Sequence, residues 1–363
     1  MPEAREDLYT NIWNSSFVRV LICATLCQFT MAVTNTVLPL YVINGLGRSA
    51  TESGLLGSLF TVGSLLCRFV SGYLCDRFGR RTCLIAGAVT VGLCLLALGF
   101  ETTLALLLLT KLLQGVGHAV HSTASNAAAS EVLPRDRMGQ GLGYYSLHSI
   151  LTNALAPTIC LALMGAGAAA GGQNYRLPLA LGGGLGLLAA CIAATVTYER
   201  QRPPRAGRPE GLSALHLSDF LERRALLPAL LVFFTSFSTG AGTYMIVFAD
   251  GMGFASISLY YIVDAAASVA VRFGLGKRLD ALRPLTAAAI AIPLNLAAYL
   301  LLALTMSEWA FLLSAVLLGV FNAVLTPLFN AMAMKLAPAG RSGSASSTYW
   351  LGFDIGMAIG MLF

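Results

Sequence analysis

Between two long apolar segments, residues 68–81 have the sequence RFVSGYLCDRFGRR. The segment combines two glycines, one acid and a cluster of arginines, at Gly72, Asp76, Arg77, Gly79, Arg80 and Arg81. The first glycine lets another backbone approach closely, and the second permits a tight turn. The Asp–Arg pair stands at a helix end, where charges can bond free backbone groups. We therefore interpret the segment as a short turn between two membrane helices, with its arginines on the positive side of the bilayer.

The composition is that of a membrane protein. The chain has 363 residues, of which 56% are hydrophobic and only 11% are charged, and its mean hydropathy is +0.74. A soluble domain has roughly 25% charged residues. Apolar runs of about 20 residues suit membrane-spanning α-helices better than the alternating strands of a barrel. We therefore predict an all-α integral membrane protein.

The apolar segments divide the chain into two halves. The predicted spans are 17–43, 51–74, 82–100, 103–130, 138–163, 176–198, 225–248, 254–276, 284–305, 309–334 and 343–363. The interruption after the sixth span is rich in Arg, Pro and Gly, a composition typical of a solvated linker. We predict an N-terminal half at 1–198, a cytoplasmic linker at 199–224 and a C-terminal half at 225–363.

The basic residues predict the orientation. They gather in alternate loops, whereas the loops on the opposite side contain only Arg48 and Arg176. The positive-inside rule then places the N-terminus in the cytoplasm. The net charge of +6 is therefore a topology signal, and we expect no nucleic-acid partner.

The turn at 68–81 resembles the signature loop between the second and third transmembrane helices of the major facilitator superfamily, with its Gly, Leu, Asp, Arg, Gly and basic pair. The resemblance implies two parallel pseudo-repeats of six helices. An internal repeat agrees with it. A shift of 204 residues aligns Arg68 with Arg272, Gly72 with Gly276, Asp76 with Asp280, Asn126 with Asn330, and Tyr145 with Tyr349.

The same shift predicts that the second half is short. It places Phe363 opposite Ile159, inside the fifth span of the first half. The C-terminal half would then have about five helices, ending within the eleventh, with the twelfth missing. A truncated chain is the favoured interpretation, and a variant with ten or eleven spans is the alternative.

The predicted conformational gate combines the signature loop with two arginines at membrane depth. Arg68 and Arg272 occupy equivalent positions in the second and eighth spans. Acidic groups or helix C-termini are their expected partners, and snorkelling to the interface is the alternative. The gate residues are Gly72, Asp76, Arg77, Gly79, Arg80, Arg68 and Arg272.

Ionisable residues inside spans are the candidates for proton coupling, because they are expensive in a bilayer and usually face a cavity. They are Asp264, Asp354, Lys111 and His118. Residues 111–115, KLLQG, resemble the Arg-x-x-Gln-Gly pattern in the fourth helix of proton-coupled efflux members, with Lys in place of Arg. The alternatives are a structural ion pair between Asp264 and Lys111, and hydrogen bonding of His118 between packed helices.

The family's cavity is formed by the first, fourth, seventh and tenth helices, so the resemblance implies a set of polar side chains that line it. The candidates are Asn35, Gln114, His118, Tyr244, Asn322 and Asn330. For the asparagines, hydrogen bonding between helices is the alternative.

Several classes of function lack their signatures. There is no Gly-Lys-Ser/Thr phosphate loop, nucleophile elbow or zincin pattern, so we expect neither an enzyme nor an ATP-driven pump. The eight cysteines have no metal-ligand spacing. We expect no cofactor and no metal.

The closest resemblance is to bacterial efflux branches that export drugs, sugars or opine metallophores, and residues 349–356, YWLGFDIG, are similar to that branch. It implies a monomer in the inner membrane that works by alternating access, with a small organic molecule and protons as its partners. An importer of a sugar or organic acid is the alternative. A non-transporting truncated relic is a second.

Overall fold

The computed structural model describes residues 11–100, 102–166, 174–198, 220–242, 245, 248–249, 252–254, 256–281 and 284–360. The N-terminal helices are α1 (Ser15–Leu40), α2 (Ala50–Phe78), α3 (Arg80–Leu98), α4 (Leu104–Glu131), α5 (Met138–Ala166) and α6 (Arg176–Ala194). The C-terminal helices are α8 (Leu226–Gly242), α10 (Ile257–Ala281), α11 (Pro284–Thr305), α12 (Glu308–Leu336) and α13 (Ser342–Gly360). Short turns are the π-helical turn Tyr41–Gly45 after α1 and the 3-10 turns Arg135–Arg137 and Arg223–Ala225.

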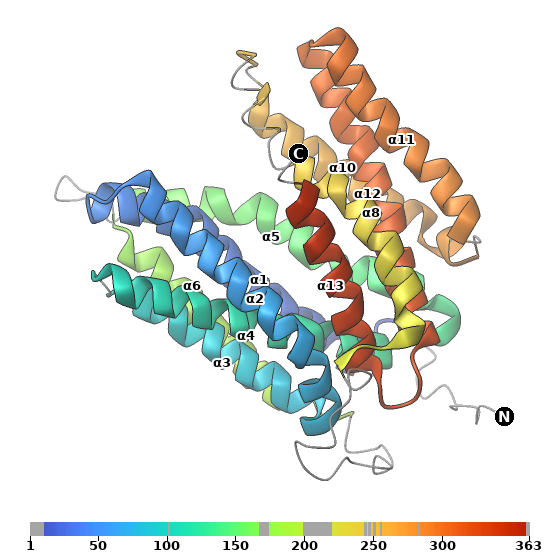
Figure 1. Cartoon of the computed structure of the whole chain (residues 1–363), viewed down its shortest axis with the longest axis horizontal. Coiled ribbons are helices and arrows are strands. Elements are labelled where there is room, and N and C mark those ends of the chain that lie inside the picture. Colours follow the sequence, from blue (N-terminus) through green and yellow to red (C-terminus); the bar gives the residue numbers. More distant parts are fainter. Residues whose placement is uncertain are drawn as a thin grey trace.

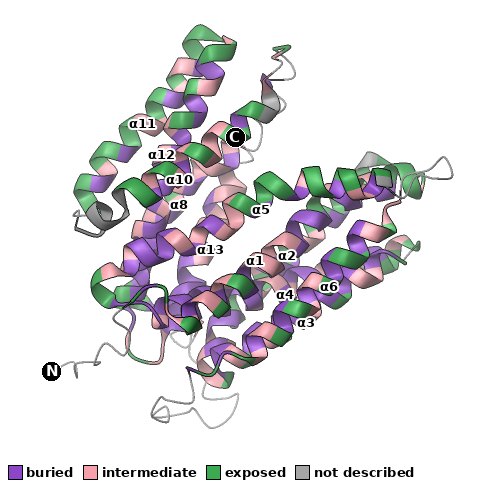
Figure 2. Ribbon diagram, turned by 180° about the vertical axis from the view of Figure 1, so that it is seen from behind, coloured by how far each residue is buried: buried purple, intermediate pink, exposed green. Residues whose placement is uncertain are grey.

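The all-helical membrane prediction is confirmed. Within the described residues, nine helices are long and apolar enough to cross a membrane, and helices also occupy the predicted eighth and eleventh spans. Most helix ends lie within a few residues of the predicted limits. In Figure 2, exposed residues follow one side of α11. They include Ile290, Ile292 and Leu296, and an exposed aliphatic face suits contact with lipid.

Local sequence sets the main helix boundaries. The Asn14 side chain accepts the Phe17 backbone N–H at the start of α1. A capping box between Ser49 and Glu52 starts α2, which satisfies backbone donors that the first turn leaves free. Gly79 joins α2 to α3 with a φ of 94°, a conformation that a residue with a Cβ adopts rarely.

The helices form two bundles that meet at one end and diverge toward the other (Figure 1). Between the bundles, α2 packs against α13, and α5 packs against α10 and α12. The largest hydrophobic cluster joins both halves, since it contains Phe17 and Tyr145 together with Phe329 and Tyr349. Three smaller clusters among the described residues each stay within one half. The larger two lie around Val37 and Leu107 and around Tyr260 and Phe311.

The end at which the halves meet is the one that the charge pattern places in the cytoplasm, because it contains the basic turns at 77–81 and 135–137. Among the hydrophobic clusters of the described residues, the halves share a core only there. The packing therefore closes the two halves at this end and leaves them separate at the other.

Candidate functional site

The signature turn caps a helix of the opposite half. Asp76 lies near the C-terminal end of α2, and α13 begins at Ser342. Its carboxylate accepts the backbone N–H of Gly343 at 2.9 Å and that of Ser344 at 2.8 Å. The Ser344 hydroxyl donates a third bond at 2.6 Å. Because a helix N-terminus has free N–H groups and a partial positive charge, the carboxylate holds α13 against α2.

Arg80 extends this cap into a buried network. Its guanidinium is fully buried and lies 2.7 Å from the Asp76 carboxylate and 3.1 Å from the Glu131 carboxylate. It also donates to the Ser342 hydroxyl at 2.6 Å, which in turn donates to Glu131 at 2.5 Å. A buried charge is stable only when it is paired and hydrogen-bonded. The network therefore joins α2, α3 and α4 to the start of α13.

Two glycines bring the backbones of α2 and α13 into contact. A Cβ on Gly72 would lie 2.8 Å from the Ser344 Cα and 2.7 Å from the Ser347 hydroxyl oxygen. A Cβ on Gly343 would lie 2.7 Å from the Gly72 carbonyl oxygen. These distances are shorter than van der Waals contact, so only glycine permits this approach.

We expect Gly72→Ala to slow transport, because the new methyl group would separate α2 from α13 and weaken the contact between the two halves. Gly57→Ala is the matched control, since it lies on the same helix with no atom within 4 Å of its Cβ position. Alanine favours a helix by about 1 kcal/mol over glycine, so the control should be neutral or stabilising. Equal initial transport rates in the two variants would contradict this account of Gly72.

The other two predicted loop residues stay within their own half. Arg77 bonds the Tyr73 hydroxyl on its own helix and lies 5.7 Å from the Phe78 ring centroid. Gly79 supplies the turn between α2 and α3.

Arg68 and Asp354 form an ion pair between the halves. The Arg68 Nε lies 2.9 Å from the Asp354 Oδ2, and their side chains are 4% and 22% exposed. Arg68 also donates to the Ser122 hydroxyl at 2.6 Å and lies 5.9 Å from the Trp350 ring centroid. The sequence marked both charges as separate candidates, and the structure pairs them.

Asn126 and Asn330 form a reciprocal amide pair between α4 and α12. Asn126 Nδ2 donates to Asn330 Oδ1 at 3.0 Å, and Asn330 Nδ2 donates to Asn126 Oδ1 at 2.7 Å. The two residues are 204 positions apart, which is the offset of the repeat, so the pair joins equivalent points of the halves. Asn330, expected to line the cavity, is only 6% exposed here. Asn126 was not among the candidates, although the repeat aligns it with Asn330.

The polar stripe of α4 is packed within its own half. Lys111 Nζ donates to Gln114 Oε1 at 2.9 Å, and Gln114 Nε2 donates to the Thr34 hydroxyl at 2.9 Å. Lys111 also lies 4.7 Å from the Phe60 ring centroid. His118 lies 5.6 Å from the same ring, and its Nδ1 has no hydrogen-bond partner among the described residues. Lys111 is thus bonded to an amide rather than to a carboxylate.

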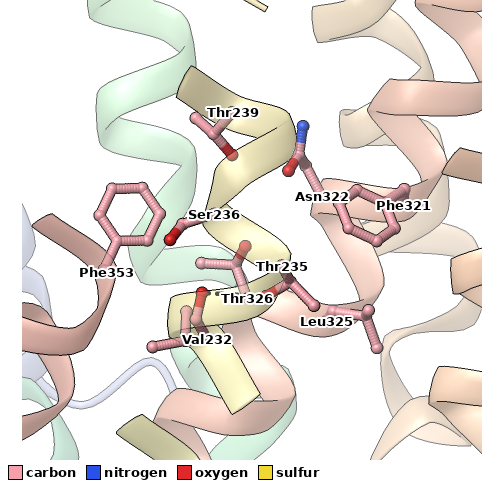
Figure 3. Close-up of a pocket in the computed structure, with 9 residues that line it drawn as sticks. All are labelled: Val232, Thr235, Ser236, Thr239, Phe321, Asn322, Leu325, Thr326 and Phe353. Atoms are coloured by element: carbon pink, nitrogen blue, oxygen red, sulfur yellow. Dashed lines mark hydrogen bonds between the residues drawn. The ribbon is translucent and has the colours of Figure 1, made fainter. Parts of the chain in front are cut away.

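A small polar pocket lies between α8, α12 and α13 (Figure 3). In this conformation it is too narrow to enclose a water molecule, and it is lined by Val232, Thr235, Ser236, Thr239, Phe321, Asn322, Leu325, Thr326 and Phe353. Hydroxyl and amide groups form its polar part, and none of these lining residues is ionisable. Phe353 directly precedes Asp354 on α13, although neither Asp354 nor Arg68 lines the pocket.

The remaining candidates lie apart from this pocket or outside the described residues. Asn35 is exposed on α1, and Asp264 is half-buried on α10. Arg272 is 5% exposed. Tyr244 lies outside the described residues. The structure therefore brings Asn322 into a pocket and Arg68 and Asp354 into contact.

The chain is similar to known membrane transporters over most of its length. The family model described as Major Facilitator Superfamily matches residues 20–361. The staphylopine export protein of Staphylococcus aureus is 23% identical over 266 residues, which are 72% of this chain and 65% of that protein. The chain therefore spans less than two thirds of that relative's length.

Two solved structures have the same fold. The human organic anion transporter MFSD10 superposes with a TM-score of 0.75 and 17% identity, over 95% of this chain and 91% of the other. The transporter FucP in its outward conformation superposes with a TM-score of 0.72 and 14% identity, over 96% of this chain and 91% of the other. At these identities the likeness concerns the fold alone.

Proposed function

The chain belongs to the Major Facilitator Superfamily of secondary transporters, and on that premise we propose that it exports a small organic molecule in exchange for protons. The observation that supports this most directly is the Arg68–Asp354 pair, which connects the two halves at membrane depth. Ionisable groups inside a membrane mark ion and proton pathways. Here such a group also holds the cytoplasmic side closed.

Protonation of Asp354 would couple the proton to the conformational change. The neutral carboxyl group no longer attracts Arg68, so the closed cytoplasmic side loses one of its charged contacts. A hydrogen bond to a charged group contributes about 1.5–3 kcal/mol, and each 1.4 kcal/mol changes an equilibrium about tenfold. Loss of this one contact would therefore favour the inward-open state by about tenfold to a hundredfold.

The exchange cycle follows from this switch. In the outward-open state, Asp354 takes a proton from the outer side, and Arg68 is released. The cytoplasmic side opens, the proton leaves to the cytoplasm, and a substrate molecule binds. When Asp354 is charged again it pairs with Arg68, the cytoplasmic side closes, and the substrate leaves outward. Lys111, His118 and Asp264 remain further candidates for the proton path.

The substrate would bind between the halves. Asn322 lines a pocket within the C-terminal half, and this pocket would have to open toward the interface as the halves move. We place Asn35, Gln114, His118, Tyr244 and Asn330 on the same candidate surface. Those that are buried in the present state would become accessible as the halves rock. The export direction is supported by the similarity to a protein named for export. The protein is a multi-pass membrane protein, and we propose the inner membrane with a cytoplasmic N-terminus.

Asp76→Asn should impair the conformational cycle and leave substrate affinity largely intact. The amide oxygen can still accept a bond from α13, but the amide N–H group would meet the N–H donors of α13 and the negative charge would be gone. The cap would therefore be weakened. Asp136→Asn is the matched control, because Asp136 is exposed on the turn at 135–137. The measurement is transport rate and substrate affinity in proteoliposomes, and wild-type turnover in Asp76→Asn would contradict the cap's role.

The test of the function uses inverted membrane vesicles with an imposed pH gradient. Cationic drugs, sugars and amino-acid-derived chelators are added in turn, and collapse of the gradient is recorded. We expect collapse with at least one compound, and none in vesicles that contain Asp354→Asn. Compounds that enter the vesicles without moving protons would refute the coupling.

Import of a sugar or organic acid is the second candidate. It is favoured by the hydroxyl and amide lining of the pocket (Figure 3), since such groups hydrogen-bond neutral polyols well. Transport direction separates the two. An importer accumulates the compound in right-side-out vesicles with an inward proton gradient, whereas an exporter accumulates it in inverted ones.

A further inference from the structure

Arg272 is a buried cation on α10. It is 5% exposed, and its Nε and Nη1 have no hydrogen-bond partner among the described residues. Arginine keeps its charge in proteins. Because a buried charge is stable only when it is paired and hydrogen-bonded, the two unbonded nitrogens leave a place for a further anionic partner.

The repeat shows what is missing at this position. Arg272 is equivalent to Arg68, and α10 packs against α5 as α2 packs against α13. Arg68 has its carboxylate, Asp354, and the Trp350 ring on the facing helix. The 204-residue offset puts Ile150 in the place of Asp354. Helix α5, which packs against α10, therefore has no carboxylate at the position equivalent to Asp354.

The same offset also predicts more room around Arg272. Ser146 and Ser149 on α5 take the places of Trp350 and Phe353. Both serine hydroxyls bond backbone carbonyl oxygens of their own helix, so they can rotate to donate to a ligand. The large side chains that surround Arg68 on α13 thus correspond to smaller side chains on α5, which leaves more space beside Arg272.

Nearby charged groups do not bond the free nitrogens of Arg272. Asp264, eight residues earlier on α10, attracts the guanidinium electrostatically, but the Nε and Nη1 of Arg272 still have no hydrogen-bond partner among the described residues. His148 on α5 bonds the Tyr145 carbonyl oxygen through Nδ1 at 2.5 Å. It can supply a positive charge or none, and never a negative one.

One residue of the polar pocket is equivalent to a residue that contacts Arg68. Ser122, which accepts from Arg68 at 2.6 Å, is equivalent to Thr326, which lines the pocket (Figure 3).

We propose that Arg272 binds a carboxylate group of the transported molecule, so that the substrate is an organic anion. This inference rests on the proposed transport function and specifies the substrate class. Arginine suits the role because its planar fork can bond both oxygens of a carboxylate.

The test is thermal unfolding of the detergent-purified full chain in sodium benzoate or sodium succinate, against sodium chloride at equal ionic strength. The variants are Arg272→Gln, which removes the charge, and Ile150→Asp, which rebuilds the internal counter-ion. Ile150→Asn is the matched neutral control. We expect at least one carboxylate to raise the melting temperature of the wild type and of Ile150→Asn. Neither charge variant should show this shift.

Two results would overturn the proposal. One is a wild type that neither carboxylate stabilises beyond chloride. The other is an Arg272→Gln variant whose melting temperature rises with carboxylate as much as that of the wild type. That result would place the anion at another site, and it can be interpreted even if Ile150→Asp fails to fold. The binding test uses no gradient, so failure of proton-coupled export would appear separately, as intact carboxylate binding without a pH-gradient response in vesicles.

Discussion

Replacing Arg80 with methionine is expected to cause a large loss of thermal stability and of transport. The side chain is fully buried and lies within 3.1 Å of both the Asp76 and the Glu131 carboxylates. Methionine fills a similar volume without charge, so it would leave two carboxylates close together without their cation. Removing one partner of a buried charge network costs about 3–5 kcal/mol. The cytoplasmic side should therefore open or unfold in this variant.

Arg81→Met is the matched control for this change. Arg81 is the next residue in the chain and donates to the Ala194 carbonyl oxygen at 2.5 Å, within the N-terminal half. This variant should retain most of its stability, because that bond is to a backbone carbonyl oxygen within one half rather than to a carboxylate that joins the halves. Melting temperatures of the purified variants provide the comparison, and equal losses in both would contradict a special role for Arg80.

Asp354→Asn should uncouple transport from the proton gradient. The amide cannot bind and release a proton at any ordinary pH, and it gives Arg68 no charge to pair with. Exchange driven by a pH gradient should therefore fall to background. Exchange of substrate for substrate, which needs no net proton movement, should continue.

Asp354→Glu is the conservative control, because it keeps the carboxylate with one more methylene. It should retain pH-gradient-driven transport at a reduced rate. Arg68→Lys keeps the opposite charge and tests the pair from the other side. Gradient-driven transport by Asp354→Asn at the wild-type rate would remove Asp354 from the coupling mechanism.

Much of the fold can be predicted from the sequence, because a bilayer imposes strong constraints. Apolar runs long enough to span it have few other stable conformations, so α3, α11 and α12 lie within a few residues of their predicted limits. The turn at Gly79 could also be predicted from local sequence, because glycine readily adopts the positive φ that this turn has. The repeat offset also identified Asn126 and Asn330 as equivalent before their contact was known.

The partners across the halves could not be predicted in this way. In a membrane helix both the lipid-facing and the packed faces are apolar, so periodicity does not show which face meets which helix. The sequence therefore marked Arg68 and Asp354 but not their pairing. It could not show that Asp76 caps α13, since the Gly343 and Ser344 donors are backbone groups.

The most direct test of the account is hydrogen–deuterium exchange of the purified wild type and of Asp354→Asn at one pH. If loss of the Asp354 charge opens the cytoplasmic side, exchange should rise at the start of α13, around Gly343 and Ser344, and in the turn at 79–81. Amides in the outer clusters around Val37 and Tyr260 should change little. Unchanged exchange at the start of α13 would contradict the claim that this carboxylate holds the cytoplasmic side closed.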